Sequence, residues 1–363
     1  MKIDGTPYRT IWLDKDDERT VCIIDQRTLP HELIIERILT VRQMEDAIRD
    51  MHLRGAPLIG AAAAFGMYLA AIELGKDVDA ESLKKAGETL LATRPTAVNL
   101  RWAVERQLET AADVGSDAMA ETLRKSAELI AEKSVEECAA IGQHGLELIK
   151  RLAKNGKRIN IMTHCNAGWL ACVDHGTATA PIYAAHDAGI PVHVWVSETR
   201  PRNQGARLTA WELNKHGVPY TLVTDSACGH LMQNGEVDMV IVGSDRTTAN
   251  GDVANKIGTY LKALAANAHD IPFYVALPGS TIDWKLDRGI GKVPIEDRDG
   301  DEVRFVQGRC DGKISKVLIC PEGSETGNPA FDVTPAKLVT AIITEKGVCD
   351  PDKLDTLYPE RGE

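Results

Sequence analysis

Two polar loops hold the side chains best suited to chemistry. The loop at residues 163–168 (THCNAG) contains Cys165, and the loop at residues 243–246 (GSDR) contains Asp245. Each loop directly follows a short run rich in Ile, Val and Met, which is typical of a strand buried on both faces of a parallel sheet. Because ligands of open α/β sheets bind beyond the carboxyl ends of the strands, Cys165 and Asp245 are the first candidates for catalysis.

Four other segments carry basic or amide side chains where an anion would need them. The first, RGAPLIG at residues 54–60, precedes an Ala-rich helix, and free backbone N–H groups at such a helix start can bind a phosphate. A plain helix start with a surface arginine would give the same pattern. The other three segments lie at residues 94–100, 198–208 and 249–260, and in the last of them we expect Asn255 and Lys256 in the first turns of a helix that covers residues 253–268. An anionic small molecule is therefore the simplest ligand.

Composition narrows the class of protein. The chain has 363 residues, more than one hydrophobic core usually supports, so two domains are expected. Hydrophobic residues make up 44% and charged residues 26%, which is ordinary for a soluble globular protein. The net charge is −11 and no dense cluster of Lys and Arg occurs, which argues against binding to nucleic acid.

Cysteine usage and the N-terminus point to the cytoplasm. The eight cysteines form no CxxC pair and no Cys/His zinc spacing, so we expect reduced thiols and no metal. The first ten residues lack the apolar core of a signal peptide. The apolar run at residues 56–72 contains Pro57 and stops at Glu73, which favours a buried helix over a membrane span.

The two halves of the chain differ in pattern, and the fold class they predict is α/β. Residues 1–154 predict a mainly helical domain with a short β-sheet, with strands at 9–13, 20–24 and 31–35 and helices at 41–51, 58–72, 80–92, 97–112 and 116–153. Residues 155–363 alternate strands with helices, which predicts parallel strands joined by right-handed crossovers. The strands are expected at 158–162, 192–196, 220–223, 237–242 and 273–277, and the helices at 179–188, 205–216, 228–233 and 253–268.

Six motifs carry a resemblance to a known family. They are RGAPLIG, RPTAVNL, THCNAG, ETRPRNQGARLTAWEL, GSDRTTANGDVANKIGTY and NPAFDVTPAKLVTAIITEKG, in this order, and the match extends over residues 20–348. Together they resemble the methylthioribose-1-phosphate isomerases of methionine salvage, which are related to ribose-1,5-bisphosphate isomerases and to regulatory subunits of translation initiation factor 2B. The resemblance implies a Rossmann-like C-terminal catalytic domain, a homodimer, no metal or cofactor, and aldose-to-ketose isomerisation of a sugar 1-phosphate. It also implies Cys165 and Asp245 as the catalytic pair and a substrate held by Arg54, Gly55, Ala56, Arg94, Gln204, Asn255 and Lys256.

The implied reaction needs a proton donor, and Asp245 is the candidate. A sugar phosphorylated at its anomeric oxygen cannot open its ring as a free aldose does, so the enzyme must help the ring oxygen to leave. An ordinary Asp has a pKa of about 3.9, so its site must raise that pKa. Burial would raise it and a facing Arg246 would lower it; because sequence neighbours often point apart, we expect burial to dominate.

Cys165 would act at C1 or C2 of the sugar. It could move a proton through an enolate-like intermediate, or it could stabilise charge while a hydride shifts, and the sequence leaves both routes open. A helix N-terminus just beyond Gly168 would increase the thiolate fraction. His164 suggests a Cys/His dyad, but adjacent residues of an extended chain face opposite sides, so we expect a structural histidine.

Two segments depart from the family pattern and leave the exact substrate open. KLDRGIGK at residues 285–292 is more basic than expected, and GRCDGKISKVLIC at residues 308–320 looks like an insertion. If these loops shape the pocket around the 5-substituent of the sugar, 5-deoxyribose 1-phosphate and ribose 1,5-bisphosphate are alternative substrates. The competing function is a non-catalytic regulatory subunit, which would need neither Cys165 nor Asp245. A nicotinamide-dependent dehydrogenase is disfavoured, because no GxGxxG motif follows a strand.

Overall fold

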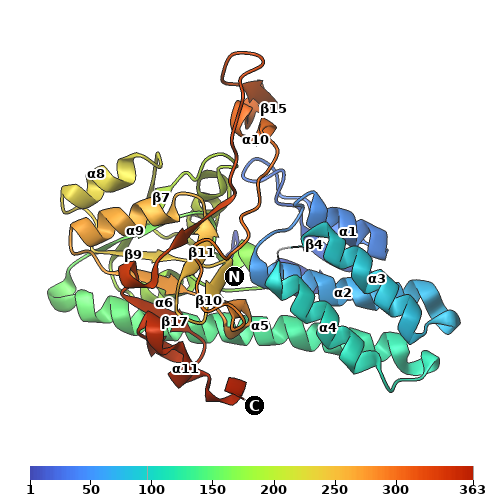
Figure 1. Cartoon of the computed structure of the whole chain (residues 1–363). Helices are drawn as coiled ribbons and strands as arrows, with labels where there is room; N and C mark the ends of the chain where they lie inside the picture. The colour runs from blue at the N-terminus through green and yellow to red at the C-terminus, as the bar shows by residue number, and fades with distance from the viewer. Residues whose placement is uncertain (96, 363) are drawn as a thin grey trace.

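A large, mostly parallel β-sheet organises the second half of the chain (Figure 1). The structure is a computed structural model that describes residues 1–95 and 97–362. Seven strands are hydrogen-bonded in the order β18-β17-β12-β9-β6-β7-β8. Every neighbouring pair is parallel except the edge pair of β17 and β18. The strands are β6 (Ile159–Thr163), β7 (Val192–Ser197), β8 (Tyr220–Val223), β9 (Met239–Val242), β12 (Phe273–Ala276), β17 (Ala341–Thr344) and β18 (Gly347–Cys349).

The strand order creates a crevice at the carboxyl ends of the central strands of this sheet. Along the chain, the six parallel strands take the spatial order 3-2-1-4-5-6 of doubly wound sheets, in which ligands bind where the order reverses. Here the reversal falls between β6 and β9, the strands that precede the two polar loops. All four residues of β9 are buried, in agreement with its continuous apolar run. The five strands predicted for this half are confirmed within a few residues at their ends.

Helices cover both faces of the sheet. On one face, α8 (Ala227–Gln233) and α9 (Thr259–Ala268) pack side by side, and on the other face α6 (Ala180–Asp187) packs against α5 (Ser116–Leu152) (Figure 1). A segment of π-helix, Gly205–Thr209, continues directly into α7 (Ala210–His216). Those two segments together match the predicted helix at 205–216.

The N-terminal half is built around one apolar helix, α2 (Ala56–Leu74). It is apolar on all sides, and such a helix is stable only when its whole circumference is buried. Its surroundings are α1 (Val41–Arg49), α3 (Ala80–Thr93), α4 (Val98–Ala111) and the first part of α5, beside a small sheet of β3 (Ile11–Leu13), β4 (Val21–Ile24) and β5 (Ile35–Ile38). Residues 56–77 are long and apolar enough to cross a membrane by composition alone, but 78% of the most apolar window is buried inside the protein. The helix therefore belongs to the core.

The long helix α5 is shared by both halves. Side chains from Met119 to Val135 pack in the core around α2, whereas Ile141, Leu148 and Ile149 pack in the core under the parallel sheet. One continuous helix thus links the helical half to the sheet that carries the polar loops. The domain boundary between residues 154 and 155 stays a prediction.

Two of the predicted elements are wrong in place or type. The third strand lies at Ile35–Ile38 rather than at 31–35, because residues 31–34 still belong to the turn and loop after Pro30. The predicted helix at 253–268 begins only at Thr259, after Gly258, whose φ is 97°. Its first part is the strand β11 (Val253–Lys256), which pairs with β10 (Arg246–Thr248) and β16 (Phe331–Thr334). β16 comes from a distant part of the chain, whereas β10 directly precedes β11 and forms a hairpin with it through the turn at Asn250 and Gly251. The helical pattern of the sequence revealed neither pairing.

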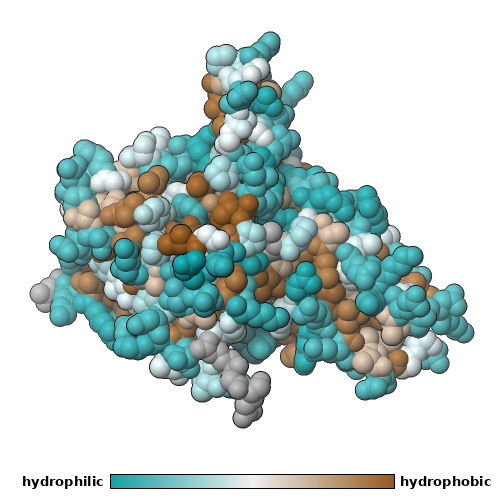
Figure 2. Space-filling model, viewed as in Figure 1, coloured by the Kyte–Doolittle hydropathy of each residue, from teal (hydrophilic) through white to brown (hydrophobic). Residues whose placement is uncertain are grey.

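The insertion at residues 308–320 is a projecting hairpin. Strands β14 (Phe305–Cys310) and β15 (Lys313–Leu318) are joined by Asp311 and Gly312, both with positive φ, as a two-residue hairpin turn requires. The hairpin stands out from the body at the top of Figure 1, and its surface is mostly hydrophilic, whereas apolar surface gathers near the centre of the same face (Figure 2). The remaining short elements are β1 (Lys2–Ile3), β2 (Thr6–Pro7), β13 (Ile282–Asp283), α10 (Asp301–Arg304) and α11 (Leu354–Leu357).

The buried position of α2 makes a stability prediction. Phe65 lies on α2 with 2% exposure, so Phe65→Ala should lower the free energy of unfolding by about 3–5 kcal/mol through lost burial and a cavity. Leu129→Ala is the control, because Leu129 is 67% exposed on α5 and its truncation should change stability by less than about 0.5 kcal/mol. Urea denaturation of the two variants measures both values, and equal effects would contradict the placement of α2 in the core.

Candidate active site

The structure brings all nine predicted site residues to one cavity at the crevice between β6 and β9. The cavity is also bordered by the N-terminal end of α2, the residues before α4, the loop after β7 and the strand β11. Besides the catalytic candidates, it is lined by Arg54, Gly55, Ala56, Arg94, Gln204, Asn255 and Lys256. The arrangement joins residues from both halves of the chain, so neither half forms the cavity alone.

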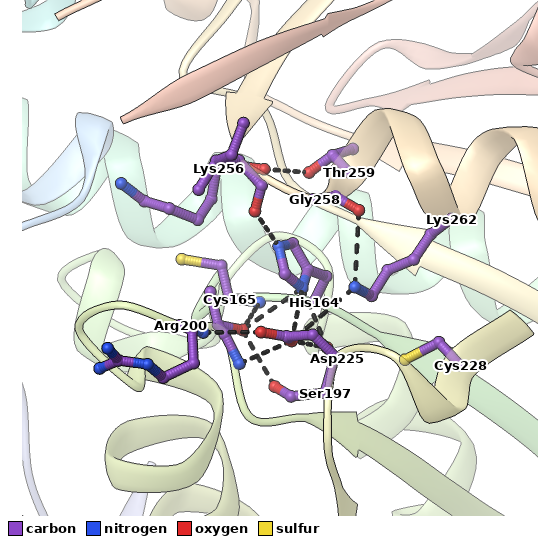
Figure 3. A network of polar contacts seen from close by, with 12 residues as sticks. His164, Cys165, Ser197, Arg200, Asp225, Cys228, Lys256, Gly258, Thr259 and Lys262 are labelled. Carbon is purple, nitrogen blue, oxygen red and sulfur yellow. Dashed lines mark hydrogen bonds and ion pairs between the residues drawn. The ribbon is translucent and has the colours of Figure 1, made fainter. Parts of the chain in front are cut away.

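Cys165 sits in a strained turn that is held by hydroxyl groups. Its φ is 63°, a conformation that non-glycine residues seldom adopt. Its backbone N–H donates to Thr199 Oγ1 at 2.8 Å, and its carbonyl accepts from Thr209 Oγ1 at 2.7 Å. These bonds come from the segments after β7 and hold the backbone from which the thiol projects. Figure 3 shows the Cys165 sulfur and the Lys256 side chain extending toward the same side of the network.

The environment of Cys165 differs from the expected one. No α-helix begins just beyond Gly168; only a 3₁₀ helix of three residues, Trp169–Ala171, follows, and α6 starts at Ala180. The expected helix N-terminus is therefore wrong. Burial raises the pKa of the Cys165 thiol, and the positive charges of Arg54 and Lys256 only oppose this effect. The neutral thiol is thus the favoured resting form.

The pKa of Asp245 follows the prediction. Burial is the largest influence and raises the pKa of this carboxyl, while Lys256 and Arg94 act in the opposite direction. The neighbouring Arg246 also lines the cavity, but its guanidinium pairs with Asp283 at 3.4 Å, and burial stays the largest influence on the pKa of Asp245. Asp245 therefore keeps its proton to a higher pH than an ordinary Asp does.

Cationic and amide groups surround the two candidates. Lys256 is 8% exposed with its amine 4.6 Å from the centre of the Phe331 ring, and burial lowers the pKa of that amine. Among the described residues, the buried Arg94 Nε and Gln204 Oε1 have no hydrogen-bond partner. Since unpaired buried polar atoms are costly, these two groups are suited to a polar ligand. Asn255 instead donates to Thr259 Oγ1 at 3.0 Å, although it also lines the cavity.

Gly55 is needed for close packing of the loop against α2. Its φ is 104°, and a Cβ atom built there would lie 2.5 Å from the carbonyl oxygen of Ala171. No side chain caps the helix that starts at Ala56, so its first N–H groups have no capping partner of that kind. The Gly therefore allows the N-terminal end of α2 to approach the segment that follows Cys165.

His164 is part of a polar network behind Cys165 rather than of a dyad (Figure 3). Its Nε2 donates to the carbonyl of Ile257 at 2.8 Å, and its Nδ1 faces the hydroxyls of Ser197 and Thr199 at 3.2 and 3.3 Å. Burial lowers the pKa of His164 to about 3, so the ring is neutral. Asp225 accepts from Ser197 Oγ and from Thr199 N–H, and this anchors the same hydroxyls. The sequence motifs gave no signal for Asp225, because it lies outside them.

The two departing segments are separate from the cavity. Neither residues 285–292 nor the hairpin insertion 308–320 contributes a lining residue, but Val293 and Pro294, directly after the first segment, do. The lining of the cavity thus gives no support to the possibility that the insertion shapes the pocket. Within the described part of the chain, no group of three or more His, Cys, Asp or Glu residues is placed to hold a metal ion.

Comparison with known proteins gives the class of this fold and site. The chain belongs to the initiation factor 2 subunit family, whose sequence profile matches residues 52–351. One solved relative is the translation initiation factor eIF-2B, subunit delta, from A. fulgidus, with 39% identity, a TM-score of 0.80 and coverage of 97% of this chain and 100% of that one.

Within that family, the chain groups with methylthioribose-1-phosphate isomerases. It is 58% identical to the isomerase of Brucella anthropi and 57% identical to that of Sinorhizobium medicae, in each case over 99% of this chain and 100% of the relative. The crystal structure of 5-methylthioribose 1-phosphate isomerase from Pyrococcus horikoshii OT3 has a TM-score of 0.84 and 41% identity, with coverage of 98% of this chain and 97% of that one. The family inferred from the six motifs is confirmed.

The close approach at Gly55 can be tested by one added methyl group. Gly55→Ala should lower the free energy of unfolding by about 3 kcal/mol or more, because it combines backbone strain with a clash against Ala171. Gly217→Ala is the control: Gly217 has a φ of 82° but open space around it, so only about 1 kcal/mol is expected. Chemical denaturation measures both, and a smaller loss at Gly55 than at Gly217 would contradict the packing described.

Proposed function

We propose that this chain converts 5-methylthio-α-D-ribose 1-phosphate to 5-methylthio-D-ribulose 1-phosphate. The observation that carries the proposal is the meeting of Cys165 and Asp245 in one cavity with cations and unpaired polar groups beside them. The full-length similarity to isomerases with this name supports the same reaction. The proposal assigns catalysis to Cys165 and Asp245 and leaves binding to the other seven lining residues predicted from the motifs.

The lining of the cavity supports a substrate with one phosphate and one apolar end. Arg54, Arg94 and Lys256 supply positive charge for a phosphate. Apolar side chains complete the wall, among them Met51, Ile59, Val98, Val293 and Phe331. An apolar wall suits a methylthio group better than a second phosphate, which would need further cations. Ribose 1,5-bisphosphate is therefore the less favoured alternative, and 5-deoxyribose 1-phosphate is the closer one.

Asp245 is proposed to open the ring. The protonated carboxyl gives its proton to the ring oxygen while the bond between C1 and that oxygen breaks, which leaves positive character at C1. The resulting carboxylate can then take the proton of the C2 hydroxyl as C2 becomes a ketone. Because burial raises the pKa of Asp245, this group can donate and recover a proton near neutral pH.

Cys165 is proposed to support a hydride shift from C2 to C1. If Cys165 were the base that removes the C2 proton, it would have to act as a thiolate, and burial disfavours that form of Cys165. With the thiol neutral, the hydrogen moves with its electron pair to the electron-poor C1, and the thiol helps to keep water out of the cavity. Of the two routes that the sequence leaves open, the structure therefore supports the hydride route.

A non-catalytic regulatory subunit is the second candidate function, since one solved relative carries the name of an initiation factor subunit. The presence of Cys165 and Asp245 in one cavity favours the enzyme. We also propose a homodimer, a cytoplasmic location, and the division into a helical domain at 1–154 and a Rossmann-like catalytic domain at 155–363. The strand order 3-2-1-4-5-6 supports the last of these.

Turnover of 5-methylthioribose 1-phosphate tests the function directly. Cys165→Ser and Asp245→Asn should each lower kcat/KM by about 100-fold or more, since each removes a group that acts on the reacting atoms. Cys310→Ser and Asp287→Asn are the matched controls, because both residues are exposed and outside the cavity. The ketose product is identified by NMR. A folded wild-type protein that is inactive on this substrate and on both alternatives would favour the regulatory subunit.

The fate of hydrogen in heavy water tests the route. If a hydride shifts within the substrate, the ketose formed in D₂O should carry no deuterium at C1, because the migrating hydrogen never meets solvent. NMR of the product after one pass of the reaction measures the deuterium at C1. Substantial incorporation would show that an enzyme base exchanges the C2 proton with solvent, and it would overturn the hydride route.

A further inference from the structure

Glu212 is a buried carboxylate that is not among the predicted site residues, and it holds the loop that contains Cys165. Glu212 lies on α7 with 0% exposure. Its Oε1 accepts from the backbone N–H of Leu170 at 2.7 Å and from Asn166 Nδ2 at 3.1 Å. Its Oε2 accepts from the hydroxyl of Tyr183 at 3.0 Å. The three donors come from two different segments, so this one carboxylate ties the loop after β6 to α6 and α7.

The loop is built around this carboxylate. A Cβ atom on Gly168 would lie 1.7 Å from Glu212 Oε2, so only glycine allows the carboxylate to come this close to the backbone. Thr209, three residues before Glu212, donates to the carbonyl of Cys165. The N-terminal end of α7 therefore contacts the loop at both of its ends.

Asn166 transmits the contact to the cavity. While its Nδ2 donates to Glu212, its Oδ1 accepts from Arg54 Nη2 and its backbone carbonyl accepts from Arg54 Nη1 at 2.9 Å. Arg54 lines the cavity beside Cys165. The chain of bonds from Glu212 through Asn166 to Arg54 thus fixes the orientation of the amide, which in turn fixes the guanidinium.

We propose that Glu212 is a positioning residue for the isomerisation, and that its ionised carboxylate holds the Cys165 loop and, through Asn166, the guanidinium of Arg54. The inference rests on the proposed function. Two of the donors, the Leu170 N–H and the Asn166 NH₂ group, can only donate hydrogen bonds, so neither can accept one from a protonated Glu212. A protonated Glu212 can donate only toward the Tyr183 hydroxyl and holds the loop less firmly. Activity should therefore depend on the charge state of Glu212.

The groups around Glu212 define the pH range in which this charge changes. Burial is the largest influence and raises the pKa of Glu212 to about 7, although the bonds from Asn166, Leu170 and Tyr183 and the charge of Arg54 oppose it. The thiol of Cys172 is also close enough to interact with it. The pKa in the unfolded chain is about 4.3, so the folded protein binds more protons between pH 4.3 and 7. Glu212 therefore contributes to the free energy of unfolding below about pH 4.3, and this contribution is lost as the pH rises from about 4.3 to 7.

Glu212→Gln tests the proposal because it keeps the shape and removes the charge. The ratio of the wild-type kcat/KM to that of the variant should be about tenfold at pH 8.5, where Glu212 is ionised. This ratio should shrink to about twofold at pH 6, where Glu212 is mostly protonated. The phosphate of the substrate titrates in the same way for both proteins, so it cancels in the ratio. A role in folding alone would give a ratio that does not vary with pH.

Melting curves give a second readout that does not depend on activity. The melting temperature of wild type should fall relative to that of Glu212→Gln as pH rises from 5 to 8, because only wild type buries a charge there. Glu236→Gln, at an exposed position, should show neither the kinetic nor the thermal difference. Equal kcat/KM of wild type and Glu212→Gln at pH 8.5, or a ratio that stays constant across the pH range, overturns the proposal. Absence of wild-type turnover overturns the proposed function instead, while the melting curves still report the charge of Glu212.

Discussion

Burial of ionisable groups is the physical constraint on which this site depends. Cys165, Asp245 and Lys256 occupy one poorly solvated cavity, and burial is the largest influence on the pKa of each. It moves all three toward their neutral forms, whereas the charge of Lys256 opposes it for Cys165 and Asp245, and their charges oppose it for Lys256. The proposed ring opening needs a carboxyl that keeps its proton closer to neutral pH than an Asp in water does, and burial shifts the pKa of Asp245 in that direction.

Polar residues next to the cavity are largely buried too, and their hydrogen bonds offset the free-energy cost of that burial. The neutral ring of His164 bonds to Ile257, and Asp225 anchors the hydroxyls that hold the Cys165 backbone (Figure 3). Glu212, on α7, holds the same loop by accepting hydrogen bonds from Leu170 N–H and Asn166 Nδ2. Each of these groups is satisfied by several hydrogen bonds, which is the condition for keeping polar atoms in a low-dielectric interior. The strained backbone of Cys165 persists because this surrounding network determines it.

The helical half contributes to the site through packing. α2 is buried on all sides, and its N-terminal end meets the loop after Cys165 through Gly55. α5 runs from the core around α2 to the core under the sheet, so it fixes the position of one half against the other. Since Arg54 and Arg94 come from the helical half and Cys165 and Asp245 from the sheet, the cavity has its composition only when this packing is complete.

The sequence by itself determined the parallel strands, the two loops that follow β6 and β9, and the family, because apolar runs and ordered motifs are local properties of a chain. It missed the strand β11, which pairs with the neighbouring β10 and, across the fold, with the distant β16, and it predicted a helix there instead. It also gave Cys165 a helix N-terminus that is absent, and it missed Glu212 and Asp225 as supports of the loop. Those features depend on which segments meet and on how much water they exclude, and only the tertiary structure decides both.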